Sequence, residues 1–265
     1  MSSTSMAARA DKYALYQASV QDPAHDVSLF TRYFKSTYGR APKILREDFC
    51  GTAAVCCEWA RSDATHHAWG VDLDPSPLKW GADFNRSTLD KDAQARVHLV
   101  KGDVRSKKTP PADVIAAQNF SFFIFKTREE LRRYFRATWQ HLGKEGILVL
   151  DMMGGSALLD DDVVETRRIS NFHYVWDQVG FDPITHDIKF YIHFKFKDGS
   201  QMKRAFTYDW RLWFLPEINE LLTEAGFKRV DVYWQDLDSR LGHVYRKRRH
   251  ARPDPAWLAC LVAVK

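Results

Sequence analysis

The chain has 265 residues, of which 45% are hydrophobic and 14% aromatic, so it can bury a large core and large-scale disorder is not expected. The net charge of +5 would allow an anionic partner, but acids and bases are interspersed over most of the chain, so charge alone does not indicate nucleic-acid binding. No apolar run reaches bilayer length, and the four cysteines form neither a zinc-ligand pattern nor a secreted disulfide framework. These observations predict a cytoplasmic protein with one α/β domain, no metal centre and no membrane segment.

The N-terminal residues 1–12 lack the apolar core of a secretory signal, and we expect a frayed tail there. Residues 11–39 have the pattern of an aromatic-bearing helix, which makes residues 1–40 a helical cap on the domain that follows. Tyr13 and Tyr16 lie three positions apart and therefore share one face of this helix.

From residue 41 onwards, short strands alternate with helices. The strands are predicted at residues 43–49, 67–72, 96–101, 113–118 and 146–152, with helices after the first, second and fourth of them. Gly143 and Gly146 stand at the last helix-to-strand turn, where we expect them to stop the helix. This alternation predicts a Rossmann-like, doubly wound α/β sheet that is mainly parallel, with helices on both faces.

The segment ILREDFCGTAAV, residues 44–55, predicts a strand that turns sharply into a helix beneath a nucleotide. A second acid, Asp72, ends the next apolar run, at the spacing at which an acid meets ribose hydroxyls in nucleotide-binding βαβ units. Gly51 is the one glycine of the turn, and Phe49 and Ala53 stand where a close-approach glycine would be expected. A bound diphosphate is therefore disfavoured, whereas an uncharged or zwitterionic adenosine derivative fits.

Residues 160–212 predict an antiparallel cover inserted after the fifth strand, because their apolar residues recur with period two around a turn at Asp198-Gly199. If this turn closes a simple hairpin, His193 pairs with Arg204. One face of the hairpin then carries Tyr191, His193, Arg204, Phe206 and Tyr208. The opposite face is an apolar stripe over residues 190–196, which we expect to pack on the sheet or on a helix.

The C-terminal part returns to helical spacing at residues 215–227, where Gly226 stops the helix, and two closing strands are predicted at residues 229–234 and 257–264. Just before this helix, Trp210 and Trp213 are expected in the core. The basic run YRKRRHAR at residues 245–252 is interpreted as a solvated loop before the final strand, with a phosphate-contacting patch as the alternative.

With these features the chain resembles the class I S-adenosylmethionine-dependent methyltransferases, from about residue 41 to residue 265. The resemblance rests on the EDFCGTA turn, the acid in GVDLD, the GD pair in LVKGDV, the NFSFF segment, GILVLD as fifth strand and the late LLTEAGF helix with two closing strands. It implies a seven-stranded sheet, S-adenosylmethionine as cofactor and a cofactor-binding domain at residues 41–265.

The resemblance also implies a set of cofactor-binding residues: Tyr16, Glu47, Cys50, Gly51, Asp72, Leu73, Asp103, Val104, Asn119 and Phe120. Glu47 and the Gly51 turn would lie against the methionyl part of the cofactor, and Asp72 would hold the ribose hydroxyls. Asp103 would lie at the adenine, and Asn119 at the methyl-donor end. Related enzymes often close the donor pocket with an N-terminal helix, so the tyrosine face of that helix is either a lid or a simple docking surface.

Methyl transfer is a direct displacement at a sulfonium methyl, so the enzyme mainly aligns nucleophile, carbon and sulfur, and a general base is needed only if the nucleophile arrives protonated. On the mixed face of the insertion, His193 would serve as base or orienting donor beside Tyr191, and Arg204 would hold a carboxylate or phosphate of the acceptor. The alternative for His193 and Arg204 is a solvent-facing cross-strand pair.

We therefore expect S-adenosylmethionine-dependent methyl transfer to a small-molecule acceptor, with nucleic acid an unlikely partner. Within the same chemistry, an RNA or protein methyltransferase that uses residues 246–252 is an alternative. From other classes, a nicotinamide-dependent oxidoreductase and a noncatalytic module that binds an adenosyl ligand remain, although the single glycine of the turn argues against the oxidoreductase. The sequence does not select the acceptor atom, the pathway or the oligomeric state.

Overall fold

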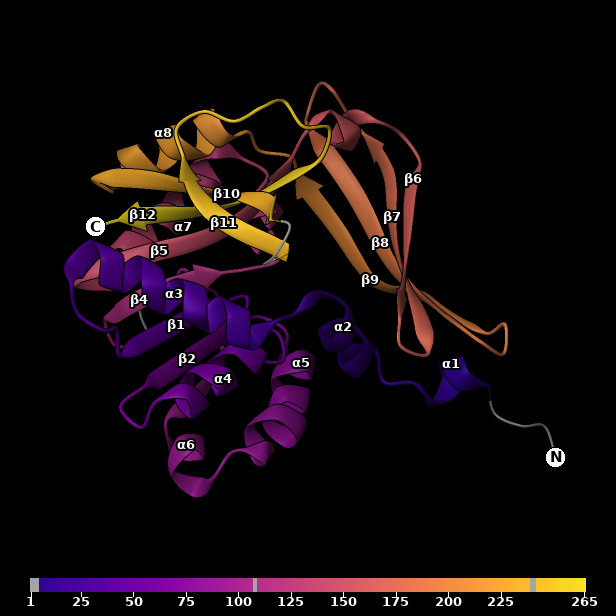
Figure 1. Ribbon diagram of the computed structural model, residues 1–265, viewed down its shortest axis with the longest axis horizontal. Helices are drawn as coiled ribbons and strands as arrows, with labels where there is room; N and C mark the ends of the chain where they lie inside the picture. Colours follow the sequence, from indigo (N-terminus) through magenta and orange to yellow (C-terminus); the bar gives the residue numbers. More distant parts are fainter. Residues whose placement is uncertain (1–4, 107–108, 239–241) are drawn as a thin grey trace.

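The computed structural model describes residues 5–106, 109–238 and 242–265. Figure 1 shows a large sheet flanked by helices and, beside it, a smaller sheet against which the N-terminal helices run. The two sheets have eight and four strands within the described residues. Among these residues, no helix combines the length and the apolar character needed to cross a membrane.

The large sheet is mainly parallel, as predicted. Its strands are β1 (Ile44–Asp48), β2 (His67–Asp72), β3 (Val97–Lys101), β4 (Ala112–Ala117), β5 (Leu142–Gly154), β10 (Arg229–Asp238), β11 (Gly242–Arg248) and β12 (Trp257–Val264). Their order is β11-β10-β12-β5-β4-β1-β2-β3, and β12 runs antiparallel to both of its neighbours. Central strands such as β4 are buried on both faces, which is why they read as continuous apolar runs.

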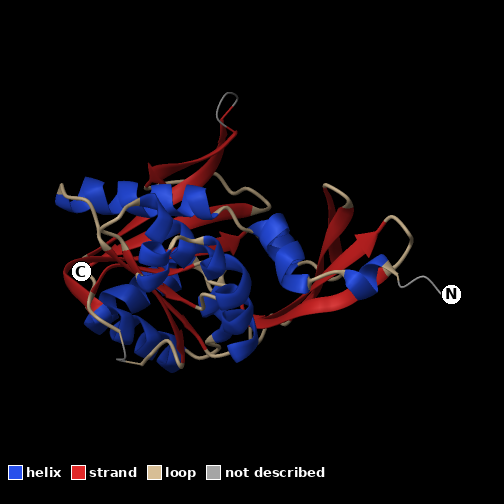
Figure 2. Cartoon of the chain, turned by 90° about the horizontal axis from the view of Figure 1, so that it is seen from below, coloured by secondary structure: helices blue, strands red, loops and turns tan. Residues whose placement is uncertain are grey.

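Helices cover both faces of this sheet, which confirms the doubly wound arrangement (Figure 2). They are α3 (Pro23–Tyr38), α4 (Ala54–Ser62), α5 (Pro75–Trp80), α6 (Lys91–Ala95), α7 (Arg128–His141) and α8 (Leu215–Ala225). On one face, Phe30 of α3 and Trp59 of α4 enter the core. On the other, Phe135 of α7 and Leu221 of α8 do so together with Trp213, and Trp210 is buried there as expected.

The predicted seven strands are eight, because residues 242–248 form β11 instead of a loop. Its partner is β10, and Tyr245 pairs with Gln235 in an antiparallel ladder. The sequence analysis did not predict this strand because consecutive basic side chains lie along it, without the apolar alternation that indicates a strand. The expected helix stop is also wrong: α7 ends at His141, β5 begins at once, and an added Cβ at Gly146 would lie 2.9 Å from Leu142 Cβ, so this glycine serves close packing.

The predicted single N-terminal helix is two helices, α2 (Lys12–Val20) and α3. They separate at Gln21, and α3 restarts with Asp22, whose side chain accepts from His25 N at 3.1 Å, followed by Pro23. The frayed tail is wrong for Met6–Arg9, which form a short helix, α1; residues 1–4 lie outside the described residues.

The insertion is a sheet of its own: β6 (Val163–Ile169), β7 (Phe172–Phe181), β8 (Asp187–Phe196) and β9 (Gln201–Arg211), all antiparallel and in sequence order. The predicted apolar stripe of β8 is buried, and it packs with Tyr174 of β7 and with Leu15 and Tyr16 of α2. The small sheet therefore presents its inner face to α2.

The predicted register of β8 and β9 is wrong, although Arg204 does lie opposite His193. Ile192 pairs with Phe206 and Phe194 with Met202, so three residues of β9 stand opposite His193 alone. Arg204 lies in this bulge with φ of 49°. As a result Phe206 shares the inner face with Ile192, and Tyr208, which pairs with Phe190, lies there too.

Candidate active site

Two adjoining cavities lie beyond the ends of β1, β2, β4 and β5. The smaller one, of about 270 Å³, is enclosed by the turns after β1, β2 and β4 and by α2. The larger one, of about 960 Å³, lies between the large sheet and the inner face of the small sheet. Five residues line both cavities: Tyr16, Gln21, Gln118, Asn119 and Tyr208. The two cavities therefore share a wall.

The turn after β1 forms the floor of the smaller pocket. Gly51 has φ of 52°, and its neighbours Phe49 and Ala53 also adopt left-handed backbone, with φ of 57° and 55°. Two positions at which glycine would be expected thus keep the glycine geometry with other side chains. Ala53 stands at the start of α4 and is fully buried.

Asp72 joins this turn to the end of β2. Its Oδ2 atom accepts from Gly51 N at 2.8 Å, and Oδ1 accepts from Asp74 N at 2.9 Å. Burial raises the pKa of Asp72, and these backbone N–H groups counteract part of that rise. The carboxyl group lines the pocket, so its remaining lone pairs are available to hydroxyl donors of a ligand.

Glu47, at the end of β1, lines the same pocket from beneath. It accepts from Cys56 N at 3.2 Å and from Cys56 Sγ at 3.0 Å. Burial raises the pKa of Glu47 to about 8, so the carboxyl group is mostly protonated at neutral pH. The pocket floor therefore carries less negative charge than its acids suggest.

Helix α2 covers the pocket and is tied to its floor. Gln17 Oε1 accepts from Thr52 Oγ1 at 2.6 Å and from Asn85 Nδ2 at 2.7 Å. Both tyrosines of the predicted face, Tyr13 and Tyr16, line the pocket. Burial raises the pKa of Tyr16 to about 12, so its phenol is neutral. The geometry thus gives α2 the position of a lid.

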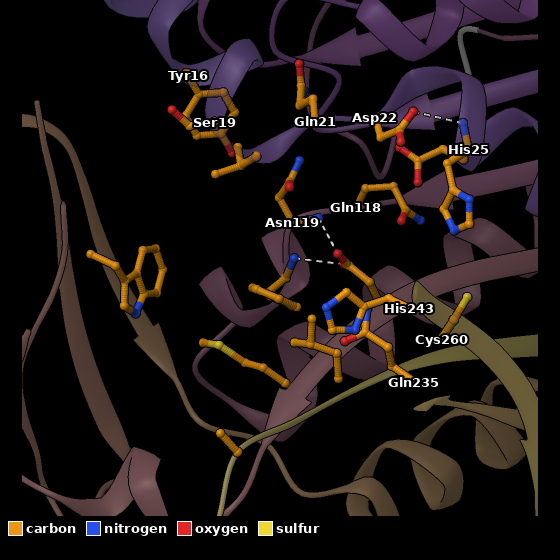
Figure 3. A pocket seen from close by; sticks show the side chains of 18 of the residues that line it. Tyr16, Ser19, Gln21, Asp22, His25, Gln118, Asn119, Gln235, His243 and Cys260 are labelled. Atoms are coloured by element: carbon orange, nitrogen blue, oxygen red, sulfur yellow. Dashed lines mark hydrogen bonds between the residues drawn. The ribbon is translucent and has the colours of Figure 1, made fainter. Parts of the chain in front are cut away.

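The turn after β4 lies at the wall between the two cavities. The backbone N–H groups of Asn119 and Phe120 donate to Asp151 of β5, at 2.7 and 2.9 Å (Figure 3). Both turn residues have φ of 57°, which aims their N–H groups at the same carboxyl group. Asp151 therefore fixes the part of the wall that faces both pockets.

Of the ten predicted cofactor residues, six line the smaller pocket: Tyr16, Glu47, Cys50, Gly51, Asp72 and Asn119. Phe120 lines the larger pocket instead. The remaining three line neither cavity. Leu73 is 70% exposed, Val104 is buried in the core, and Asp103 accepts from Arg105 Nε at 2.9 Å.

The three predicted catalytic residues lie outside the cavity linings, on the opposite face of the small sheet. His193 Nδ1 accepts from Arg204 N at 2.9 Å, which leaves the proton on Nε2, 3.0 Å from Asp177 Oδ2. The Arg204 guanidinium lies 4.4 Å from the centroid of the Tyr191 ring. The three side chains form a cluster on this face, and none of them lines either cavity.

Sequence reasoning missed the chemistry of the larger pocket. Asp26 of α3 and Asp151 of β5 both line it, and burial raises the pKa of each carboxyl group to about 7. Aromatic rings face them from the small sheet: Tyr174, Trp176, Tyr208 and Trp210. Asp151 could have been identified from the sequence, because it is an acid at the end of the otherwise apolar segment GILVLD. Asp26 could not have been identified in this way, because a single acid on an amphipathic helix is common.

The interpretation of the basic run as a solvated loop is wrong for residues 245–248, which belong to β11, whereas residues 249–252 lie outside the strands and are exposed. Three side chains of β11 pair with acids of β10. Lys247 lies 2.8 Å from Asp231, and Arg248 lies 2.7 Å from Asp236. Arg246 reaches a third acid of the same strand. The described residues contain no group of three or more His, Cys, Asp or Glu side chains that could hold a metal ion.

No protein-family model and no curated protein sequence match the chain. A methyltransferase from Clostridium acetobutylicum, described as S-adenosylmethionine-dependent, is 17% identical over 94% of this chain and 97% of its own, with a TM-score of 0.67. DesVI of Streptomyces venezuelae is 19% identical over 97% and 98%, with a TM-score of 0.69. An amino pentose methyltransferase from Micromonospora echinaspora, with S-adenosylmethionine bound, is 16% identical over 95% of each chain, with a TM-score of 0.68.

Proposed function

We propose that this chain, which has the class I methyltransferase fold, is an S-adenosylmethionine-dependent methyltransferase that acts on a small-molecule acceptor by direct in-line displacement. The observation that carries this proposal is the shared wall: a pocket that ends in the Asp72 carboxyl group adjoins a second, larger pocket through Tyr16, Asn119 and Tyr208. Two ligands bound side by side would meet at these residues.

The smaller pocket fits an adenosyl cofactor. Asp72 would accept hydrogen bonds from the ribose hydroxyls, and the neutral floor around Glu47 would tolerate the methionyl part. The turn has only Gly51 as a glycine, which disfavours a diphosphate and hence a nicotinamide cofactor. When bound, S-adenosylmethionine supplies a methyl group on a sulfonium.

The chain's own residues would align the partners and exclude water. Helix α2 closes the smaller pocket, while the aromatic rings of Tyr16, Phe206 and Tyr208 line it at the side of the small sheet. Alignment and water exclusion are what a direct displacement chiefly requires. The larger pocket, at about 960 Å³, has the size of a small-molecule site.

The alternative of an RNA or protein methyltransferase rests on residues 246–252, of which Arg246, Lys247 and Arg248 already pair with acids of β10. A noncatalytic module that binds the same ligand differs in turnover. It would bind S-adenosylmethionine and never release S-adenosylhomocysteine with any pool of acceptors.

The first test is calorimetric titration with S-adenosylmethionine, S-adenosylhomocysteine and NAD. We expect micromolar binding of the first two, and Asp72→Ala should raise their Kd at least about 10-fold, since a charged hydrogen-bond acceptor is lost. Asp83→Ala removes an exposed carboxyl group outside both pockets and serves as the matched control. Preference for NAD, or equal Kd values for Asp72→Ala and the wild type, would overturn the proposal.

A further inference from the structure

The larger pocket has an excess of acids. Its described lining includes four carboxyl groups, those of Asp22, Asp26, Asp151 and Glu165, against one arginine, Arg167, and two histidines. The arginine lies 4.9 Å from the centroid of the Tyr174 ring, on the small sheet. An anionic acceptor would be repelled by this lining, and a cationic one would be attracted.

Asp26 has an unusual position among these acids. It lies in the first turn of α3, faces the pocket, and receives no hydrogen bond or ion pair from any residue that the structure describes. Burial raises its pKa, and the nearby charges of Asp151 and Asp22 raise it further. Asp26 is partly buried at the pocket wall, so a ligand that supplies a donor would stabilise its carboxyl group.

Aromatic rings complete the pocket on the side of the small sheet. The Tyr208 and Trp210 ring centroids lie 4.4 Å apart, and Trp176 lies 5.9 Å from Tyr208 and 6.5 Å from Trp210. Ring faces attract cations, most strongly away from water. Tyr208 also lines the smaller pocket, so this cluster reaches the wall at which the two ligands would meet.

We propose that the acceptor is an amine, bound as its ammonium form between the carboxyl groups of Asp26 and Asp151 and the rings of Trp176, Tyr208 and Trp210. This inference rests on the proposed function and names its substrate class. A hydroxyl acceptor would leave the charge of the two acids unmatched. A metal ion is not favoured either, because the described acids do not form a group of metal-ligand type.

The arrangement also accounts for the protons. A carboxylate takes one proton from the bound ammonium, which frees the lone pair of the nitrogen. The nitrogen then forms the bond to the methyl carbon while the carbon–sulfur bond breaks. The electron pair of the broken bond stays on sulfur, which becomes a neutral thioether. The product is again an ammonium. Because the pKa of both acids is raised to about 7, each can carry the proton at neutral pH.

The test compares amines with alcohols of the same shape in the full-length protein. The probes are benzylamine against benzyl alcohol and cyclohexylamine against cyclohexanol, titrated by ligand-observed NMR at about pH 8 with saturating S-adenosylhomocysteine. We expect each amine to bind at least about 10-fold more tightly than its alcohol. Asp26→Asn should reduce this preference to about 3-fold or less, since the Asp26 side chain has no hydrogen-bond or ion-pair partner to lose among the described residues.

Two further variants keep the test sharp. Asp92→Asn removes an exposed carboxyl group of α6, away from the pocket, and should leave the preference unchanged. Asp151→Asn should also reduce it, and its thermal unfolding must be compared with that of the wild type because Asp151 holds the turn after β4.

Amines that bind no more tightly than the alcohols, including no binding of either, would overturn the inference. So would a preference that survives unchanged in Asp26→Asn. The proposed function fails separately. If calorimetry shows no binding of S-adenosylmethionine, the methyltransferase proposal falls whatever the amines do, whereas cofactor binding without any amine preference overturns only the acceptor class.

Discussion

Several acidic residues near the two pockets accept backbone hydrogen bonds, and the pKa of each carboxyl group depends on how deeply it is buried. Asp72 and Asp151 each hold a turn by accepting two backbone N–H groups, at the ends of β2 and within β5. Glu47 is buried with weaker compensation, from one backbone N–H and one thiol. Burial raises the pKa of all three carboxyl groups, so hydrogen bonds that position the turns offset only part of the free-energy cost of burying the charged forms.

The free-energy cost of burying the Glu47 carboxyl group should depend on pH. Its pKa is raised from 4.5 to about 8 in the folded protein, so between these values the unfolded chain ionises while the folded chain keeps its proton, and the free energy of unfolding falls as pH rises. Asp72 and Asp26 face it and add to the rise. Glu47→Gln removes this loss. We expect the difference in the free energy of unfolding between variant and wild type to grow by on the order of 3 kcal/mol, in favour of the variant, from pH 5 to pH 8.

Urea unfolding of both proteins at the two pH values measures this gain. Glu129→Gln, a change at an exposed glutamate of α7, is the control and should show no such trend. A difference between Glu47→Gln and the wild type that is the same at pH 5 and pH 8 would contradict the assignment.

At the level of elements, the sequence predicted what local patterns determine. The five parallel strands were found because each is a short apolar run, and Asp72 was found because parallel strands bring their ends to one edge. The register of β8 and β9 was not predicted correctly, since no local sequence pattern indicates the bulge at Arg204. Asp26 belongs to the site only through the packing of α3 against the end of β5, which no local pattern encodes.

Helix α2 should behave as a separately stabilised lid. Gln17 ties it to Thr52 and Asn85, so Gln17→Ala should loosen the helix without disturbing the sheet. We expect faster amide hydrogen exchange in residues 12–20, unchanged exchange in β4 and β5, and a Kd for S-adenosylmethionine raised about 3- to 10-fold. Gln140→Ala, at an exposed position of α7, is the control. Unchanged exchange in α2 would show that the tie is not what holds it.

On the scale of the whole molecule, the chain carries a net charge of +5, and part of its basic run lies in β11, at an edge of the large sheet. That run faces the acids of β10, so its charges stabilise a hairpin at the edge of the large sheet. Edge strands are commonly protected by charged side chains in this way. These ion pairs therefore help to hold β11 on β10.

Replacing Lys247, Arg248 and Arg249 together by alanine should therefore lower stability and leave RNA binding unaffected. We expect a loss of about 1–2 kcal/mol, because Asp231 is buried and loses one of its two cations. Filter binding with a single-stranded RNA 20-mer should show the same weak association for variant and wild type. Salt-sensitive binding that the substitutions abolish would restore the alternative of an RNA methyltransferase.

The larger pocket takes its walls from both sheets, and the chain passes between them only after β5, where Gly155 has φ of 117°, and after β9. A molecule held there would contact both sheets, whose apolar side chains already share one core through Phe190 and Trp210. Its shape would be matched by side chains of the small sheet such as Glu165 and Trp176, which line the larger pocket and not the smaller one, whereas the smaller pocket rests mainly on the turns of the large sheet and on α2. One donor site could then serve acceptors of different breadth, and the small sheet is the part in which changes of substrate range would accumulate.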